Sequence, residues 1–294
     1  MMQTLDQTIT LPDGRILGYA QSGDPKGKPL FMFHGLNSSR LEAKIINEKM
    51  TKTGIRAIGI DRPGMGLSSF CANRTILDFV EDVKILANVL GIENFSILGT
   101  SAGAPYALAC VYKIPHMIAS CGLVSGLAPM KWDASEINKR YRAFIFVAQK
   151  LPWLVEPFFW LLQGRYSQDI SKTDRFLESV VFALDDVDKK LLRNAAIKNA
   201  LLDTFRESYR NGAQGVAYDA RLVLSESWGF RLDDIHFENI HLWHGEKDLA
   251  VPVSMAKSMA KMIHNAKIKL YRNDGHLSIM FHQMDEILDT FYKS

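Results

Sequence analysis

The pentapeptide Gly99-Thr100-Ser101-Ala102-Gly103 decides the fold of this chain. It follows an apolar run, Phe95 to Leu98, that predicts a buried strand, and it precedes a small-residue stretch, Ala104 to Cys110, that predicts a helix. A G-x-S-x-G turn between strand and helix is typical of a serine exposed on a sharp, strained turn. Side chains two positions before or after the serine would collide with the neighbouring strand and helix, so both positions need glycine. Ser101 is therefore a candidate nucleophile above a helix N-terminus, which favours negative charge.

The elements on either side of this turn alternate between strand and helix. A hairpin with Asp13-Gly14 at its turn comes first. Apolar strands are then predicted at 29–33, 56–60, 95–98 and 118–124, with helices at 41–53 and 75–90, and the pattern resumes with strands at 240–245 and 268–271 and helices at 253–263 and 277–291. Wholly apolar strands are typical of a parallel sheet that is covered on both faces. We predict an α/β fold with a mainly parallel eight-stranded sheet flanked by helices.

A long segment interrupts this alternation. Between residues 127 and 230 the sequence predicts only helices, at 133–150, 151–162, 174–184 and 188–210. We therefore divide the chain into a core of residues 1–126 and 231–294 and a cap segment of residues 127–230.

An aromatic stretch stands out within the cap segment. Its residues Trp153, Phe158, Phe159 and Trp160 are interrupted by prolines. A stretch of this kind packs in a core, lines an apolar cleft or anchors a protein at a membrane surface. We expect it to contribute to a substrate-binding cleft and not to insert stably into a membrane.

A serine hydroxyl needs a base, usually a histidine that a carboxylate holds in one tautomer. His276 follows the last predicted strand, and Asp248 follows the strand at 240–245. Both residues are thus predicted at the sheet edge where α/β active sites form. Two other acids compete for the role: Glu246 would point elsewhere in its turn, and Asp274 is too near His276 in sequence to orient it easily. The position after the strand at 118–124 offers no carboxylate.

The oxyanion of an acyl-transfer reaction needs two preorganised N–H donors. The residue after the nucleophile, Ala102, is expected to supply one, and Leu36, in the loop after the strand at 29–33, the other. His34 borders that loop and is a candidate substrate-binding residue. A metal site finds no support, because the odd spacing of His241 and His244 puts their rings on opposite faces of one strand.

A nucleotide-binding interpretation of a second glycine motif fails. Gly64 and Gly66 follow a strand, but the third glycine of the dinucleotide fingerprint is replaced by Ser69, and no acidic residue ends a following strand about 20 residues on.

Composition excludes several classes of protein. The 294 residues include 35 Lys and Arg and 32 Asp and Glu, a net charge of +3 that is too balanced to indicate a nucleic-acid partner. The odd number of cysteines lacks metal-ligand spacing. The first residues do not resemble a signal peptide, and no run approaches the roughly 20 apolar residues of a membrane span. We expect a cytoplasmic protein; its oligomeric state does not follow from the sequence.

Together these motifs resemble the α/β-hydrolase superfamily, in particular its members with a helical cap. The resemblance covers the core, including His34-Gly35, the loop from Asp61 to Ser68, the Ser101 turn, the Asp248 loop and Gly275-His276. It implies a cofactor-free hydrolase, most simply a carboxylesterase for small to medium apolar esters that works through an acyl-enzyme. Serine at the nucleophile position argues against the haloalkane dehalogenase and epoxide hydrolase branches. Hydrolysis of other acyl or C–C bonds, or slow-turnover ligand binding, are the alternatives.

Overall fold

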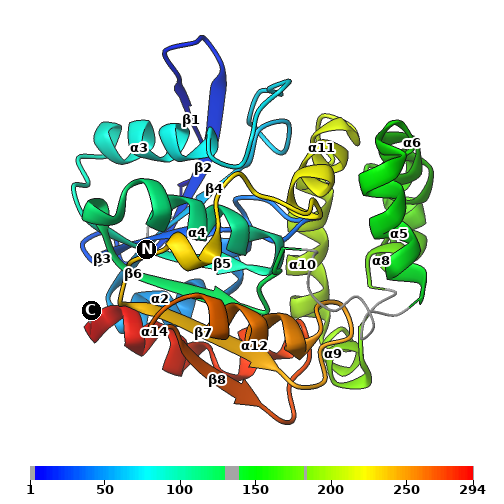
Figure 1. Ribbon diagram of the computed structural model, residues 1–294. Coiled ribbons are helices and arrows are strands. Elements are labelled where there is room, and N and C mark those ends of the chain that lie inside the picture. Colours follow the sequence, from blue (N-terminus) through cyan, green and yellow to red (C-terminus); the bar gives the residue numbers. More distant parts are fainter. Residues whose placement is uncertain (1–3, 130–138, 182–183, 294) are drawn as a thin grey trace.

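One eight-stranded sheet forms the centre of the computed structural model, which describes residues 4–129, 139–181 and 184–293 (Figure 1). The strand order is β1-β2-β4-β3-β5-β6-β7-β8. The first two pairs in this order are antiparallel and all the others are parallel, which confirms the predicted mainly parallel sheet. The strands are β1 (Thr4–Thr10), β2 (Ile16–Gly23), β3 (Lys28–Phe33), β4 (Ile55–Ile60), β5 (Phe95–Thr100), β6 (Ile118–Val124), β7 (Ile240–Gly245) and β8 (Lys267–Tyr271).

Helices cover both faces of the sheet because apolar side chains alternate between the faces along each strand. In β3, Phe31 and Phe33 pack in the core cluster that includes α3, α4 and α12, whereas Leu30 and Met32 pack in the cluster that includes α2 and α14. The helices of the core are α1 (Glu42–Ile45), α2 (Asn47–Thr53), α3 (Phe79–Val89), α4 (Ala104–Lys113), α12 (Val253–Met262), α13 (Ser278–His282) and α14 (Met284–Lys293), with short turns η1 (Ser101–Gly103), η2 (Pro115–Met117) and η7 (Leu232–Asp234).

Between β6 and β7 the described residues form helices and no strand. These are α5 (Lys139–Lys150), η4 (Pro152–Leu154), α6 (Val155–Phe159), a π-helical turn η5 (Trp160–Gly164), α7 (Arg165–Ser167), η6 (Ile170–Lys172), α8 (Thr173–Val180), α9 (Asp186–Leu191), α10 (Ala195–Ser208) and α11 (Gln214–Val223). The start of the helix predicted at 133–150 lies outside the described residues. Figure 1 shows α10 and α11 between the sheet and the outer helices α5, α6 and α8. The division into core and cap stays a prediction.

Several predicted helices differ from the observed ones. The helix predicted at 188–210 is split at Asn194, whose side chain accepts hydrogen bonds from the N–H groups of Ala196 and Ile197 and so begins α10 as its N-cap. The helix at 41–53 is split at Ile46, and the final helix is split between α13 and α14. Helix α11 was not predicted.

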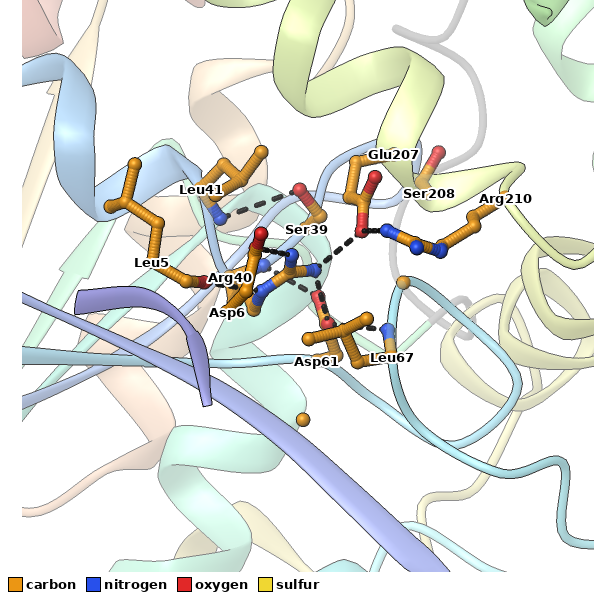
Figure 2. A network of polar contacts seen from close by, with 12 residues as sticks. Leu5, Asp6, Ser39, Arg40, Leu41, Asp61, Leu67, Glu207, Ser208 and Arg210 are labelled. Atoms are coloured by element: carbon orange, nitrogen blue, oxygen red, sulfur yellow. Dashed lines mark hydrogen bonds and ion pairs between the residues drawn. The ribbon is translucent and has the colours of Figure 1, made fainter. Parts of the chain in front are cut away.

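Helix α10 is attached to the core through the buried side chain of Arg40 (Figure 2). The guanidinium donates to Asp61 Oδ2 at 2.8 Å, to Glu207 Oε1 in α10 at 2.7 Å and to the carbonyl of Leu5 in β1 at 2.7 Å, and it pairs with Asp6. A buried charge is stable only when it is paired and hydrogen-bonded in this way. One side chain therefore joins the N-terminal strand, the loop after β4 and the cap segment.

Helix α11 approaches the core more closely still. A Cβ on Gly215 would lie 2.1 Å from the carbonyl oxygen of Gly64, so the two backbones touch and both positions exclude larger residues. Nearby, Asp219 of α11 is fully buried and pairs with Arg62 at 2.9 Å and with Arg74 at 3.0 Å. These contacts fix α11 onto the loop that follows β4.

Candidate active site

The backbone of Ser101 is strained, with φ at +52°, a conformation that residues other than glycine rarely adopt. Such strain is held by the packing around the turn. A Cβ on Gly103 would lie 1.9 Å from the carbonyl oxygen of Phe33, and one on Gly99 would lie 2.8 Å from the carbonyl oxygen of Gly103 and 2.9 Å from Ala107 Cβ. The predicted need for glycine on both sides of the serine is confirmed.

The loops after β7 and β8 bring Asp248 and His276 together. His276 Nδ1 lies 2.8 Å from Asp248 Oδ2. An ionised carboxylate can only accept, so Nδ1 carries the proton and Nε2 is left as the acceptor on the far side of the ring. Asp248 is itself held by the backbone, because its Oδ1 accepts hydrogen bonds from the N–H groups of Ala250 at 2.9 Å and Val251 at 2.7 Å.

His244, at the end of β7, is a further neighbour of the carboxylate. It is fully buried, and its Nε2 lies 2.8 Å from the carbonyl of Val251 and 3.3 Å from Asp248 Oδ2. Both neighbours are acceptors, so Nε2 carries a proton that faces the same oxygen as His276. No contact between His244 and Asp248 was predicted, although their separation of four residues in sequence indicated that the two lie close together.

Burial and pairing act on these ionisable groups in opposite directions. Burial disfavours the Asp248 carboxylate, but the charges and hydrogen bonds of His276 and His244 outweigh it and lower the pKa of Asp248. Burial also disfavours imidazolium at His276, yet Asp248 outweighs it, with further contributions from Asp188 and Glu42, so the pKa of His276 is raised. The site thus favours an ionised acid beside a histidine that readily accepts a proton.

The rival acids lie elsewhere. Asp274 is buried and binds His282 Nδ1 at 2.6 Å and the Gln283 amide at 2.8 Å. Glu246 is exposed. Of the three acids considered, only Asp248 contacts His276.

Ser101 and His276 line one cavity of about 180 Å³. Most of the other side chains around it are apolar, and they come from the loop after β3, from α1, from the loop after β7, from the segment around α13 and from the cap segment. The apolar ones are Leu36, Ile45, Val181, Leu184, Leu201, Phe205, Ala250, Leu277, Met280 and Phe281. A mainly apolar hollow with a few polar groups is the usual form of a small-molecule site.

Glu42 of α1 holds the loop after β3 in place through two hydrogen bonds. Glu42 Oε2 accepts hydrogen bonds from the Gly35 N–H at 3.0 Å and the Ser38 hydroxyl at 2.6 Å. Burial raises the pKa of this carboxyl, while those two donors and the nearby Thr100 hydroxyl oppose the rise. The Gly35 N–H is already engaged and is therefore excluded as an oxyanion donor, whereas Leu36, the predicted donor, lines the cavity together with Ser101.

The structure does not place His34, the predicted substrate-binding residue, at the cavity that holds Ser101. His34 is buried and does not line the cavity. Its Nδ1 lies 2.8 Å from the carbonyl of Gly35, and its Nε2 accepts from the N–H of Arg62 at 3.4 Å. Burial, together with the Arg62 charge, lowers the pKa of His34 well below its usual value, so it stays neutral. Through these contacts His34 stabilises the loop after β3.

The structure also does not place the cap aromatics, predicted to contribute to the substrate cleft, at this cavity. None of the four lines the cavity that holds Ser101. Trp153 and Trp160 are 66% and 54% exposed, Phe158 is exposed, and Phe159 is buried within the cap segment. Among the described cap residues, Leu201 and Phe205 of α10 and residues 181 and 184, which precede α9, line the cavity instead. In the described chain no single helix is long and apolar enough to span a membrane, although 142–150 and 152–167, bent by 112°, meet that criterion as a pair.

The chain belongs to the family described as alpha/beta hydrolase fold, whose model matches residues 28–283. The sheet order, the strained serine turn and the placement of Asp248 and His276 agree with that membership, and the chain is a hydrolase of this fold.

Known proteins of several activities resemble this chain. A putative proline iminopeptidase of Mycoplasma pneumoniae is 22% identical over 286 residues, which cover 91% of each protein. A hydrolase from Pseudomonas aeruginosa has a similar structure, with a TM-score of 0.72, 17% identity and 98% of each chain covered. An esterase from Exiguobacterium antarcticum has a TM-score of 0.68 at 19% identity, with 98% of this chain and all of that one covered (100%). At these identities the two structures establish the fold and not the substrate.

Proposed function

We propose that this chain is a serine hydrolase that cleaves carboxylic esters with a small to medium apolar acyl group. The observation that carries the proposal is the pairing of His276 with the buried Asp248 beside a cavity that also holds the strained Ser101. The arrangement offers a nucleophile, a base and an orienting acid in one place.

The chemistry follows from the protonation of His276. With Nδ1–H donated to Asp248, Nε2 accepts the proton of Ser101 as its oxygen attacks the ester carbonyl. The N–H groups of Leu36 and Ala102 receive the oxyanion. His276 then returns the proton to the leaving alcohol, and a water molecule, deprotonated by His276, hydrolyses the acyl-enzyme. Charge on Asp248 stabilises the imidazolium that forms in both steps.

The cavity wall supports an apolar acyl group. Leu201 and Phe205 from α10 and Met280 from α13 line it. Burying a CH₂ group against such a wall contributes about 0.8 kcal/mol, so each added methylene should favour binding until the cavity is filled.

A second candidate activity is the release of an N-terminal residue from a peptide. The similarity along 91% of the length of a putative proline iminopeptidase favours it. Both activities use the same acyl-transfer steps, and they differ in whether the leaving group is an alcohol or an amine.

A substrate panel separates the candidates. Nitrophenyl esters from acetate to octanoate, prolyl nitroanilide and a vinylogous diketone would be compared on the wild type and on Ser101→Ala. Ester turnover that Ser101→Ala abolishes, with one fluorophosphonate adduct at Ser101, supports the proposal. Faster turnover of the prolyl amide would favour the peptidase, turnover of the diketone alone would favour a C–C hydrolase, and no turnover of any substrate would favour a binding protein.

A further inference from the structure

A cap residue contacts the loop that carries His276. Asp188, in the first turn of α9, is fully buried. Its Oδ2 accepts a hydrogen bond from the backbone N–H of His276 at 2.7 Å, and its Oδ1 accepts one from the N–H of Ser278 at 2.8 Å. Both oxygens are thus committed to one loop, 88 residues further along the chain. Charge-assisted hydrogen bonds of this kind are roughly twice as strong as neutral ones.

The carboxylate is itself held in place. The N–H of Asp188 donates to Asp185 Oδ1, the N-cap of α9, at 2.8 Å. A Cβ on Gly275 would lie 2.0 Å from Asp185 Oδ2 and 2.7 Å from Asp188 Oδ2. The glycine before His276 therefore leaves the space that the two cap carboxylates occupy, which is a physical reason for the Gly275-His276 pair.

Helix α10 of the cap segment contacts the loop after β3, which also lines the cavity. Thr204 of α10 lies 3.0 Å from the Ser38 hydroxyl and accepts from the N–H of Ser39 at 3.0 Å. In contrast to these contacts, the contact of Asp188 is with the backbone of the proposed base itself. Of these two described cap residues, Asp188 is therefore the one that contacts the proposed base.

We propose that Asp188 is a positioning residue, which fixes the backbone of His276 and so makes helix α9 of the cap segment a part of the catalytic arrangement. The proposal rests on the proposed role of His276 as the base. A displaced base loses its alignment with Ser101, and a misplacement of about 1 Å costs on the order of 100-fold in rate. The negative charge of Asp188 has a second effect, which is to raise the pKa of His276. The other charged groups that raise this pKa are Asp248, which also contacts His244, and Glu42.

The test compares Asp188→Asn with Asp186→Asn, whose side chain is 95% exposed on the same helical turn. An amide accepts through one atom only, so its NH₂ group would face one of the two loop N–H donors. We expect Asp188→Asn to lower kcat for a nitrophenyl ester about 100-fold with little change in KM. The acid limb of the kcat/KM profile should move to lower pH, because loss of a nearby negative charge lowers the pKa of His276. Asp186→Asn should match the wild type in both measurements.

Gly275→Ala is the second variant, in case Asp188→Asn does not fold. It keeps both carboxylates but pushes the loop away from them, and it should lower kcat and shift the acid limb in the same direction. Variants that melt at a lower temperature yet keep the kcat and the acid limb of the wild type would overturn the proposal. Labelling of the wild type distinguishes this outcome from an incorrect triad. If fluorophosphonate does not label Ser101 in the wild type, the triad itself is refuted.

Discussion

Replacing Asp248 by asparagine changes one atom and tests the whole arrangement. Four donors point at the carboxylate: two backbone N–H groups at Oδ1, and His276 and His244 at Oδ2. An asparagine amide has one acceptor oxygen, so it can accept from the donors at only one of these two positions. The backbone donors cannot change, and leaving them unpaired costs about 1–3 kcal/mol each, whereas a histidine can switch tautomer. The Asn oxygen should therefore face the backbone and its NH₂ group the histidines.

The consequence for the base follows directly. His276 must then accept at Nδ1, which places its proton on Nε2, where it cannot take the proton of Ser101. The same change in a serine protease lowers kcat about 10⁴-fold, and that ratio corresponds to about 5.4 kcal/mol of barrier at 1.36 kcal/mol per factor of ten. We expect a loss of this order with folding retained.

The assay is steady-state hydrolysis of a nitrophenyl ester, together with the rate of fluorophosphonate labelling at Ser101. Glu246→Gln is the control, because it removes an exposed carboxylate two residues away. A kcat for Asp248→Asn within tenfold of the wild type would refute the reasoning and return the role to another acid.

The same variant has a signature in stability. Because the folded-state pKa of Asp248 is lowered below the ordinary value near 3.9, its ionisation stabilises the fold above about pH 4. That contribution is lost as the pH falls through the folded-state pKa. Urea unfolding of wild type and variant should therefore differ most near pH 7 and converge in acid; a difference that grows in acid would contradict the pairing.

Three further substitutions, two of them paired with a control variant, test the cavity, the contact of α11 with the core and the serine turn. Phe205→Ala should raise kcat/KM for octanoate relative to acetate esters about tenfold by enlarging the cavity, whereas Trp160→Ala, outside the cavity, should leave the chain-length profile unchanged. Asp219→Asn leaves two buried arginines uncompensated and should cost about 3–5 kcal/mol in urea unfolding; a loss under about 1 kcal/mol would be inconsistent with that burial. Gly103→Ala puts a Cβ 1.9 Å from a backbone carbonyl and should prevent folding, whereas Gly91→Ala, with no atom within 4 Å, should cost only about 1–3 kcal/mol for its positive φ; equal thermal stability of the two would contradict the steric argument.

The sequence by itself determined the sheet and the three chain positions around which the site forms. Apolar runs bounded by glycines predict parallel strands because burial on both faces removes the alternation of polar residues. Ser101, Asp248 and His276 each lie in the turn or loop that follows a strand, and the carboxyl ends of parallel strands share one edge, so their proximity follows from chain order. The need for glycine on both sides of Ser101 could also be predicted, because it follows from the sharp turn between strand and helix; that Phe33 of β3 is the neighbour that crowds Gly103 comes only from the structure.

Only the tertiary structure decided what surrounds those positions. Asp188 looks like any acidic residue of an exposed helix, and its contact with His276 depends on how α9 lies against a loop 88 residues away. The exposure of Trp153 and the place of Phe205 in the cavity wall have the same origin, since hydropathy gives the cost of exposing a side chain but not the neighbour that covers it. The periodicity of strands and helices can be recognised from neighbouring residues in the sequence. The packing of the cap segment on the core depends instead on the shapes of two surfaces that come from distant parts of the chain.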